Sequence, residues 1–147
     1  MKLESILPIG ISLISLAGTT YTFLKNRKIA EAQVELQIHT KIVDSKKDIN
    51  KFIYESNKND KKIKILIMES LIENELNTYE EACNKYLDNK IDKKRFRKSY
   101  LNEIQALFNA QSTKGKLTDY TSKYNAIRKV NEEWNNLKKR NIQNKAY

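Results

Sequence analysis

The stretch from Ser5 to Leu24 constrains this chain most, because it runs for twenty residues without a charged side chain. As an α-helix it would be about 30 Å long, which matches the hydrocarbon thickness of a bilayer. Its apolar residues surround the helix instead of forming one stripe, which argues against a helix buried in a water-soluble core. We therefore predict a transmembrane helix.

The flanks of this stretch predict its orientation. Lys25, Arg27 and Lys28 follow it directly, whereas Lys2 at the other end is offset by Glu4. Positively charged flanks stay on the cytoplasmic side of a membrane. We expect a single-pass protein of the cell (inner) membrane, with its N-terminus outside and the rest of the chain in the cytoplasm.

A cleaved signal peptide, giving a secreted protein, is the alternative for the same stretch. Ile6–Leu16 has the length of a signal-peptide apolar region, and Ser15-Leu16-Ala17 fits a small-x-small cleavage site. Apolar sequence continues past that site to Leu24, and the cations come after it. Because of those cations we favour the uncleaved anchor.

The rest of the chain has the composition of long helices joined by short turns. Charged residues make up 31% of the chain, and three glycines and one proline are too few for the turns of a β-rich domain. Apolar residues recurring every three or four positions predict four helical segments. They are Arg27–Asn57, Lys61–Asp88, Asp92–Ala110 and Asp119–Lys139.

The segment Lys61–Asp88 carries the strongest helical signal. A sustained apolar stripe predicts a central helix that faces the core. The stripe consists of Ile65, Met68, Ile72, Leu76, Tyr79, Cys83 and Tyr86. The single cysteine, Cys83, is therefore interpreted as a small buried hydrophobic residue.

The segment Arg27–Asn57 fits two periods. It alternates like a strand from Ala30 to Ile38, yet no partner strand is evident, and its apolar residues also share one helical stripe. We predict a helix continuous with the span, with a break near Asp44-Ser45. It either joins the bundle as a fourth helix or serves as a stalk.

Local signals predict the connections between the later segments. Asp92 is a suitable N-cap, because its carboxylate can accept from the first backbone N–H groups of a helix. Gln111–Thr118, which contains Gly115, is predicted to be a flexible loop, and Thr118 or Asp119 is expected to cap the last helix.

These expectations define an all-α protein, with an N-terminal transmembrane helix followed by an antiparallel three- to four-helix bundle. Residues 1–28 are assigned to the membrane anchor, with the span at 5–24. Residues 29–60 form a membrane-proximal helix or stalk, and residues 61–147 form the bundle with a frayed basic tail.

Catalytic chemistry finds no support in the sequence. Glu69 and Glu73 share a helix face but lack the Glu-x-x-His pattern of carboxylate metal sites, so a solvated acidic face is preferred. The only histidine, His39, has no local partner acid or nucleophile and is interpreted as an ordinary exposed residue. We predict no enzyme activity, no catalytic residue, no cofactor and no metal.

The net charge of +10 is uneven, because the acidic segment Ile65–Asn89 lies between basic neighbours. The densest basic run, Lys93–Lys98, is expected to pair with Glu73, Glu80 and Glu81. Anionic lipid and nucleic acid are the alternative partners of the run. Candidate anion- or lipid-contacting residues are Lys25, Arg27, Lys28, Lys93, Lys94, Arg97 and Lys98.

A family resemblance rests on core and turn positions. The blocks are Leu76-Asn77-Thr78-Tyr79-Glu80-Glu81-Ala82-Cys83, Tyr86-Leu87-Asp88, Ile91-Asp92, Phe96, Tyr100, Ile104, Tyr124-Asn125-Ala126-Ile127 and Glu133-Trp134. With these blocks the chain resembles a group of uncharacterised small bacterial membrane proteins that have one N-terminal span, a basic stop and a C-terminal helical region. The resemblance implies an architecture and a bacterial membrane setting, and no activity.

Three functions are consistent with these features. The first is a non-enzymatic, single-pass, membrane-anchored helical interaction module that binds the lipid bilayer and a protein partner. The second is a binder of anionic lipid or nucleic acid through the basic run. The third is a small membrane-perturbing protein, toxin-like or holin-like. Small residues at Ser15/Thr19 and Gly18/Thr22 add the hypothesis of a homodimer through the span.

Overall fold

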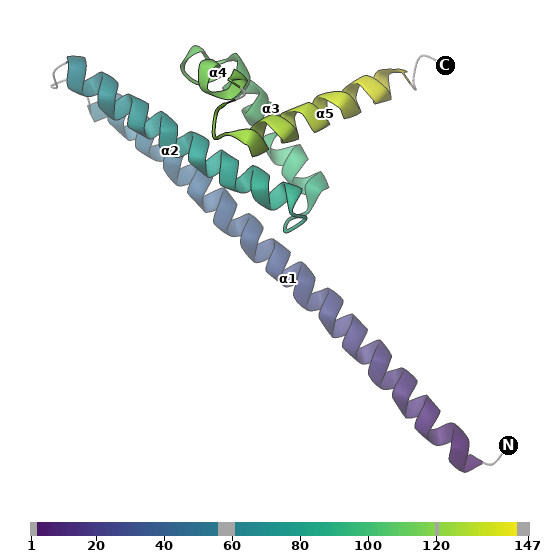
Figure 1. Cartoon of the computed structure of the whole chain (residues 1–147). Coiled ribbons are helices and arrows are strands. Elements are labelled where there is room, and N and C mark those ends of the chain that lie inside the picture. The colour runs from purple at the N-terminus through teal and green to yellow at the C-terminus, as the bar shows by residue number, and fades with distance from the viewer. Residues whose placement is uncertain (1–2, 56–60, 120, 144–147) are drawn as a thin grey trace.

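The computed structural model of the protein is all-α over the part of the chain that it describes, residues 3–55, 61–119 and 121–143 (Figure 1). Within these ranges the side chains of 3–15, 17 and 139–143 lie outside the description. The helices are α1 (Leu3–Glu55), α2 (Lys61–Leu87), α3 (Lys93–Asn109), α4 (Gln111–Thr118) and α5 (Asn125–Gln143). The predictions of an all-α fold and a helical bundle are confirmed.

Helix α1 is a single helix of 53 residues. The predicted break near Asp44-Ser45 is wrong. Ser45 is only 3% exposed, and its hydroxyl donates to the carbonyl oxygen of Ile42 at 2.9 Å. A serine that satisfies its hydroxyl on the preceding turn can remain inside a helix.

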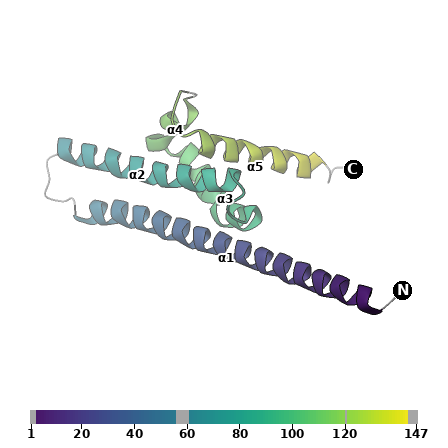
Figure 2. The same cartoon turned by 60° about the horizontal axis from the view of Figure 1, so that its bottom comes forward.

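The later half of α1 packs against α2, and the two run side by side in opposite directions in both views (Figures 1 and 2). Ile38 and Ile42 of α1 are buried in the core, with Val34 partly buried beside them. Residues 18–30 are exposed, and Figure 1 shows this part of α1 extending beyond the bundle. The predicted helix between Arg27 and Asn57 therefore contributes residues to the core and also continues outside it.

An aromatic cluster joins α2, α3 and α5 at the centre of the bundle. The rings of Tyr86 and Trp134 meet edge to face with centroids 5.6 Å apart, and Phe96 lies 4.9 Å from Tyr100 and 6.0 Å from Trp134. Aromatic pairs at such separations add to the stabilisation that burial alone provides. Trp134 is fully enclosed, so the last helix is held to the bundle by its largest side chain.

Helix α3 begins as the sequence predicts. The Asp92 carboxylate accepts from the backbone N–H of Arg95 at 2.9 Å, which is the N-cap geometry. This hydrogen bond, aided by nearby positive charge, holds the pKa of Asp92 below its ordinary value. The N-cap prediction is confirmed.

The segment Gln111–Thr118 corrects the prediction of a flexible loop, because it forms the short helix α4. Thr113 and Leu117, four residues apart, are both buried, and the Thr113 hydroxyl donates to the carbonyl of Leu107. Gly115 lies inside this helix with a negative φ, so no left-handed turn requires a glycine there. Two buried side chains outweigh the weak helix propensity of the segment.

The start of α5 also differs from the expectation, because the helix begins at Asn125 and neither Thr118 nor Asp119 caps it. The Asp119 carboxylate instead accepts from the N–H and hydroxyl of Thr121 in a turn. The N-terminus of α5 instead receives a carboxylate from α2. Glu80 accepts from the backbone N–H groups of Ala126 at 2.8 Å and Ile127 at 3.0 Å.

Among the residues that the structure describes, no helix is long and apolar enough to cross a membrane. Most of the predicted span, Ser5–Leu24, lies where side chains are outside the description, although its backbone belongs to α1. The transmembrane helix stays a prediction from the sequence.

Candidate interaction surfaces

The first candidate surface is apolar and lies at the free end of the α1–α2 hairpin, which we call the hairpin end. Only α1 and α2 reach this end of the molecule, whereas α3, α4 and α5 pack farther along α2 (Figure 1). Its exposed apolar side chains are Ile53, Tyr54, Ile63, Ile65, Leu66 and Ile67.

At the hairpin end, the predicted core stripe of α2 is exposed and not buried. Ile65 is 51% exposed and Leu66 is 59% exposed, whereas Leu76 and the later stripe residues are buried. Ile72 between them is partly buried against the core. The stripe is therefore confirmed as a core face in its second half and wrong as one at Ile65. Exposed apolar side chains concentrated at one end of a molecule often mark an interaction site.

The candidate cations after the apolar stretch lie exposed on α1. Lys25, Arg27 and Lys28 are outside the bundle, where α1 has no neighbouring helix (Figure 1). Arg27 is paired with Glu31 one turn later, with Nε 2.9 Å from the carboxylate oxygen. An exposed pair of this type adds little stability, so these residues are available to another binding partner.

The other candidate cations, Lys93, Lys94, Arg97 and Lys98, lie on the first turns of α3. Their predicted partners on α2 are engaged elsewhere: Glu73 pairs with Lys123, and Glu81 pairs with Lys41 at 2.7 Å. Glu80 caps α5, as described above. The predicted pairing of the basic run with these three acids is therefore wrong.

The α3 cations instead line a groove of about 680 Å³ between α3, α5 and the end of α2, which we call the α3–α5 groove. Both charged and apolar side chains form its walls. They are Tyr86, Lys93, Lys94, Arg97, Lys98, Leu101, Asn102, Glu133 and Leu137.

Tyr86 connects the α3–α5 groove to the core. Its hydroxyl donates to Glu133 Oε1 at 2.7 Å and accepts from Trp134 Nε1 at 3.0 Å. Burial, with the hydrogen bond to Glu133, raises the pKa of Tyr86 to about 12. The phenol is therefore neutral near pH 7, and Glu133 is held by an internal donor.

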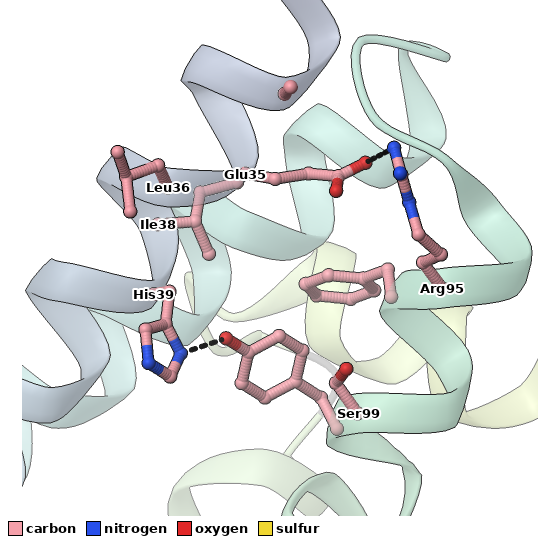
Figure 3. A pocket seen from close by; sticks show the side chains of 9 residues that line it. Glu35, Leu36, Ile38, His39, Arg95 and Ser99 are labelled. Carbon is pink, nitrogen blue, oxygen red and sulfur yellow. Dashed lines mark hydrogen bonds and ion pairs between the residues drawn. The ribbon is translucent and has the colours of Figure 1, made fainter.

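A second, smaller pocket of about 310 Å³ lies between α1 and α3 (Figure 3). Glu35 accepts from Arg95 Nη2 at 3.0 Å and from the backbone N–H of Asp92 at 2.8 Å. His39 Nδ1 shares a hydrogen bond of 3.1 Å with the Tyr100 hydroxyl. These contacts fix the start of α3 to α1, and no local sequence pattern connects their partners.

The remaining candidate groups have structural environments. Cys83 is a free thiol, fully buried, and burial raises its pKa, so the prediction of a small buried hydrophobic residue is confirmed. Among the described residues, no three histidine, cysteine or acidic side chains gather where a metal ion could be held. Glu69 is exposed as predicted, and Glu73 of the same predicted acidic face pairs with Lys123.

Comparison with known proteins found no matching family model, no similar curated protein and no similar solved structure. The resemblance to small bacterial membrane proteins stays a prediction.

Proposed function

We propose that this protein is a non-enzymatic, single-pass, membrane-anchored helical interaction module. Its anchor is the uncharged stretch Ser5–Leu24, and its bundle faces the cytoplasm because Lys25, Arg27 and Lys28 follow that stretch. The bacterial setting belongs to the same proposal and rests on the resemblance alone.

The observation that carries this proposal is the continuity of α1, which runs unbroken from the uncharged stretch into the bundle. A continuous helix transmits the position of the anchor to the bundle without a flexible linker. From Leu24 to Glu55 it advances about 46 Å at about 1.5 Å per residue. The hairpin end would thus be held well clear of the lipid headgroups.

Polar side chains at the end of the uncharged stretch support the same proposal. Thr20 donates its hydroxyl to the carbonyl of Leu16 at 3.0 Å, and Thr22 donates to that of Gly18 at 2.8 Å. Polar groups in a bilayer require internal partners, and these threonines have them.

The hairpin end is the surface that we assign to a protein partner. Its exposed apolar side chains come from two adjacent helices, and Tyr54 at 90% exposure offers an aromatic anchor of the kind that dominates protein interfaces. Lys61 and Lys64 flank it on α2, so the complementary surface is apolar with an acidic rim.

Site-specific photo-cross-linking in intact cells tests this assignment. A photoreactive residue at Leu66 is expected to give a discrete cross-linked band that is lost in the I65D variant. The matched control places the same probe at Lys114, an exposed residue of α4. Equal band patterns from both positions would contradict the assignment, and a reporter fused after Tyr147 checks the cytoplasmic orientation.

A further inference from the structure

Helix α3 lies parallel to α1, with its basic start directed toward the uncharged stretch. Three side-chain contacts join the two helices, and residues later in α1 meet residues later in α3. Glu35 meets Arg95 at 3.0 Å, His39 meets Tyr100 at 3.1 Å and Lys46 meets Glu103 at 2.8 Å. The first turn of α3 is therefore the end of the bundle nearest to the predicted anchor.

The distance between that end and the anchor is short. Glu35 follows Leu24 by eleven residues, which correspond to about 16 Å of helix. The polar headgroup layer occupies roughly 6 Å of this distance on each side of a bilayer. Transmembrane helices tilt by about 20° on average, and a tilt toward the bundle would bring the start of α3 still closer to the membrane surface.

The cations at this end are not neutralised by their surroundings. Lys94 and Lys98 are exposed and make no ion pair with a described carboxylate. Lys93 lies 4.8 Å above the Tyr86 ring, and Arg97 Nη2 donates to the carbonyl of Trp134 at 3.4 Å. Their charges remain without a carboxylate counterion.

Nearby acids do not cancel this charge. Glu35 and Asp92 both pair with Arg95, which lies on the side of α3 facing α1. The acid in the α3–α5 groove itself is Glu133, which accepts from the Tyr86 hydroxyl. Four cations against one carboxylate leave the groove strongly positive.

The α3–α5 groove also has an apolar component. Leu101 of α3 and Leu137 of α5 line it together with the four cations. A lining that combines cations with apolar side chains matches an amphiphile that carries a phosphate, and juxtamembrane clusters of basic residues favour anionic lipid.

We propose that this end of the bundle docks on the anionic phospholipid headgroups of the bilayer that holds Ser5–Leu24, with Lys94, Arg97 and Lys98 contacting headgroup phosphate at the α3–α5 groove. The inference rests on the proposed anchoring and adds the lipid class that the bundle recognises. Docking would fix the tilt of α1 and hence the direction in which the hairpin end points.

The surroundings of the cations favour lipid over single-stranded nucleic acid. Single-stranded nucleic acid is held by exposed aromatic rings on which bases stack. The aromatic residues of this region, Tyr86, Phe96 and Trp134, are all buried in the core. The patch offers charge and aliphatic surface without a stacking platform.

The test uses Trp134, the only tryptophan, as a built-in donor for energy transfer to dansyl-labelled lipid headgroups. The full chain is reconstituted into phosphatidylcholine vesicles and into vesicles with added phosphatidylglycerol. We expect greater transfer in the anionic vesicles, falling toward the phosphatidylcholine value as salt rises, because surface electrostatics are screened. Equal transfer in both vesicle types would overturn the docking.

The K94E/K98E variant is expected to lose the difference between the vesicles. Losing two juxtamembrane cations weakens docking by on the order of thirtyfold, and reversing their charge weakens it at least as much. The matched control is K114E/K116E, the same charge change on α4, which should keep the difference. A double variant that behaves like the control would also overturn the inference.

Two further measurements, vesicle flotation and oligonucleotide binding, distinguish failure of the anchor from failure of the docking. A chain that does not float with phosphatidylcholine vesicles contradicts the anchor itself, whereas a chain that floats without an anionic preference contradicts only the docking. Salt-dependent binding of an oligonucleotide at Lys94 and Lys98 that outcompetes the anionic vesicles would assign the patch to nucleic acid and overturn the lipid proposal.

Discussion

The two halves of α2 share one pattern of apolar residues but have opposite environments. In the second half Leu76, Tyr79 and Tyr86 are buried among α1, α3 and α5. In the first half Ile65 and Leu66 remain exposed, because the later helices do not reach them (Figures 1 and 2). Helical periodicity thus identifies an apolar face of a helix. Whether that face is buried in the core or stays exposed for a binding partner depends on where the other helices pack.

This difference in burial makes the hairpin end a candidate binding surface. Burying apolar area contributes roughly 25 cal/mol per Å², so exposed residues such as Leu66 forgo stabilisation that a partner could provide. The buried half holds the bundle together, and the exposed half is available for binding.

The largest expected effect comes from the same substitution in each half. L76A is expected to lower the free energy of unfolding by about 3 kcal/mol, because it opens a cavity in the core. L66A, in the same helix, should change it by less than about 0.5 kcal/mol. Urea unfolding in mild detergent, followed by Trp134 fluorescence, measures both. Similar losses would contradict the contrast between the halves.

The cap that α2 supplies to α5 predicts the next effect. E80A is expected to cost about 2 kcal/mol of unfolding free energy, because two backbone N–H groups lose a charged acceptor. E69A removes an exposed carboxylate from the first half of the same helix and should be nearly neutral. Equal stability of the two variants would show that Glu80 does not act as a cap.

A smaller loss, dependent on pH, is predicted at the start of α3. D92A should cost about 1 kcal/mol near pH 7. The native pKa of Asp92 is lowered, so its contribution is present above the ordinary value of 3.8 and disappears as the pH falls through the native pKa.

The pH dependence of D92A is measured by repeating the unfolding at a series of pH values. The curves of the native protein and of D92A should converge in acid, whereas D48A, which removes an exposed aspartate of α1, should follow the native protein throughout. A gap between the native protein and D92A that persists well below pH 3 would contradict this role.

The smallest effect is a gain in α4. G115A is expected to raise the unfolding free energy by about 0.5 kcal/mol, because alanine has the higher helix propensity. A Cβ there would meet nothing within 4 Å. Thermal unfolding measures the gain, and a clear loss would mean that the segment is not helical.

Local patterns predict the parts of this fold that depend on neighbouring residues. The helical periods locate α2 and α3, and Asp92 is recognisable as an N-cap from its position before a helix. Contacts distant in sequence decide the rest. Glu80 caps a helix 46 residues later, and His39 meets Tyr100 61 residues later.

The candidate surfaces are also partly predictable from local sequence and partly decided by contacts distant in sequence. The basic residues Lys93–Lys98 are visible in the sequence, but their direction toward the uncharged stretch depends on the contact between Glu35 and Arg95. The hairpin end could not be predicted, because Ile65 lies on the same stripe as Leu76 and only the placement of the later helices distinguishes them.

Membrane extraction tests the central claim, that α1 connects a bilayer anchor to the bundle. The full chain is expected to stay in the membrane pellet through washes at high salt and alkaline pH and to leave it only in detergent. The variant with I11K and L16K puts two charges into the uncharged stretch, each costing about 2.5–3.5 kcal/mol near the bilayer centre, and should be released without detergent. Release of the native chain by alkali alone would contradict the account.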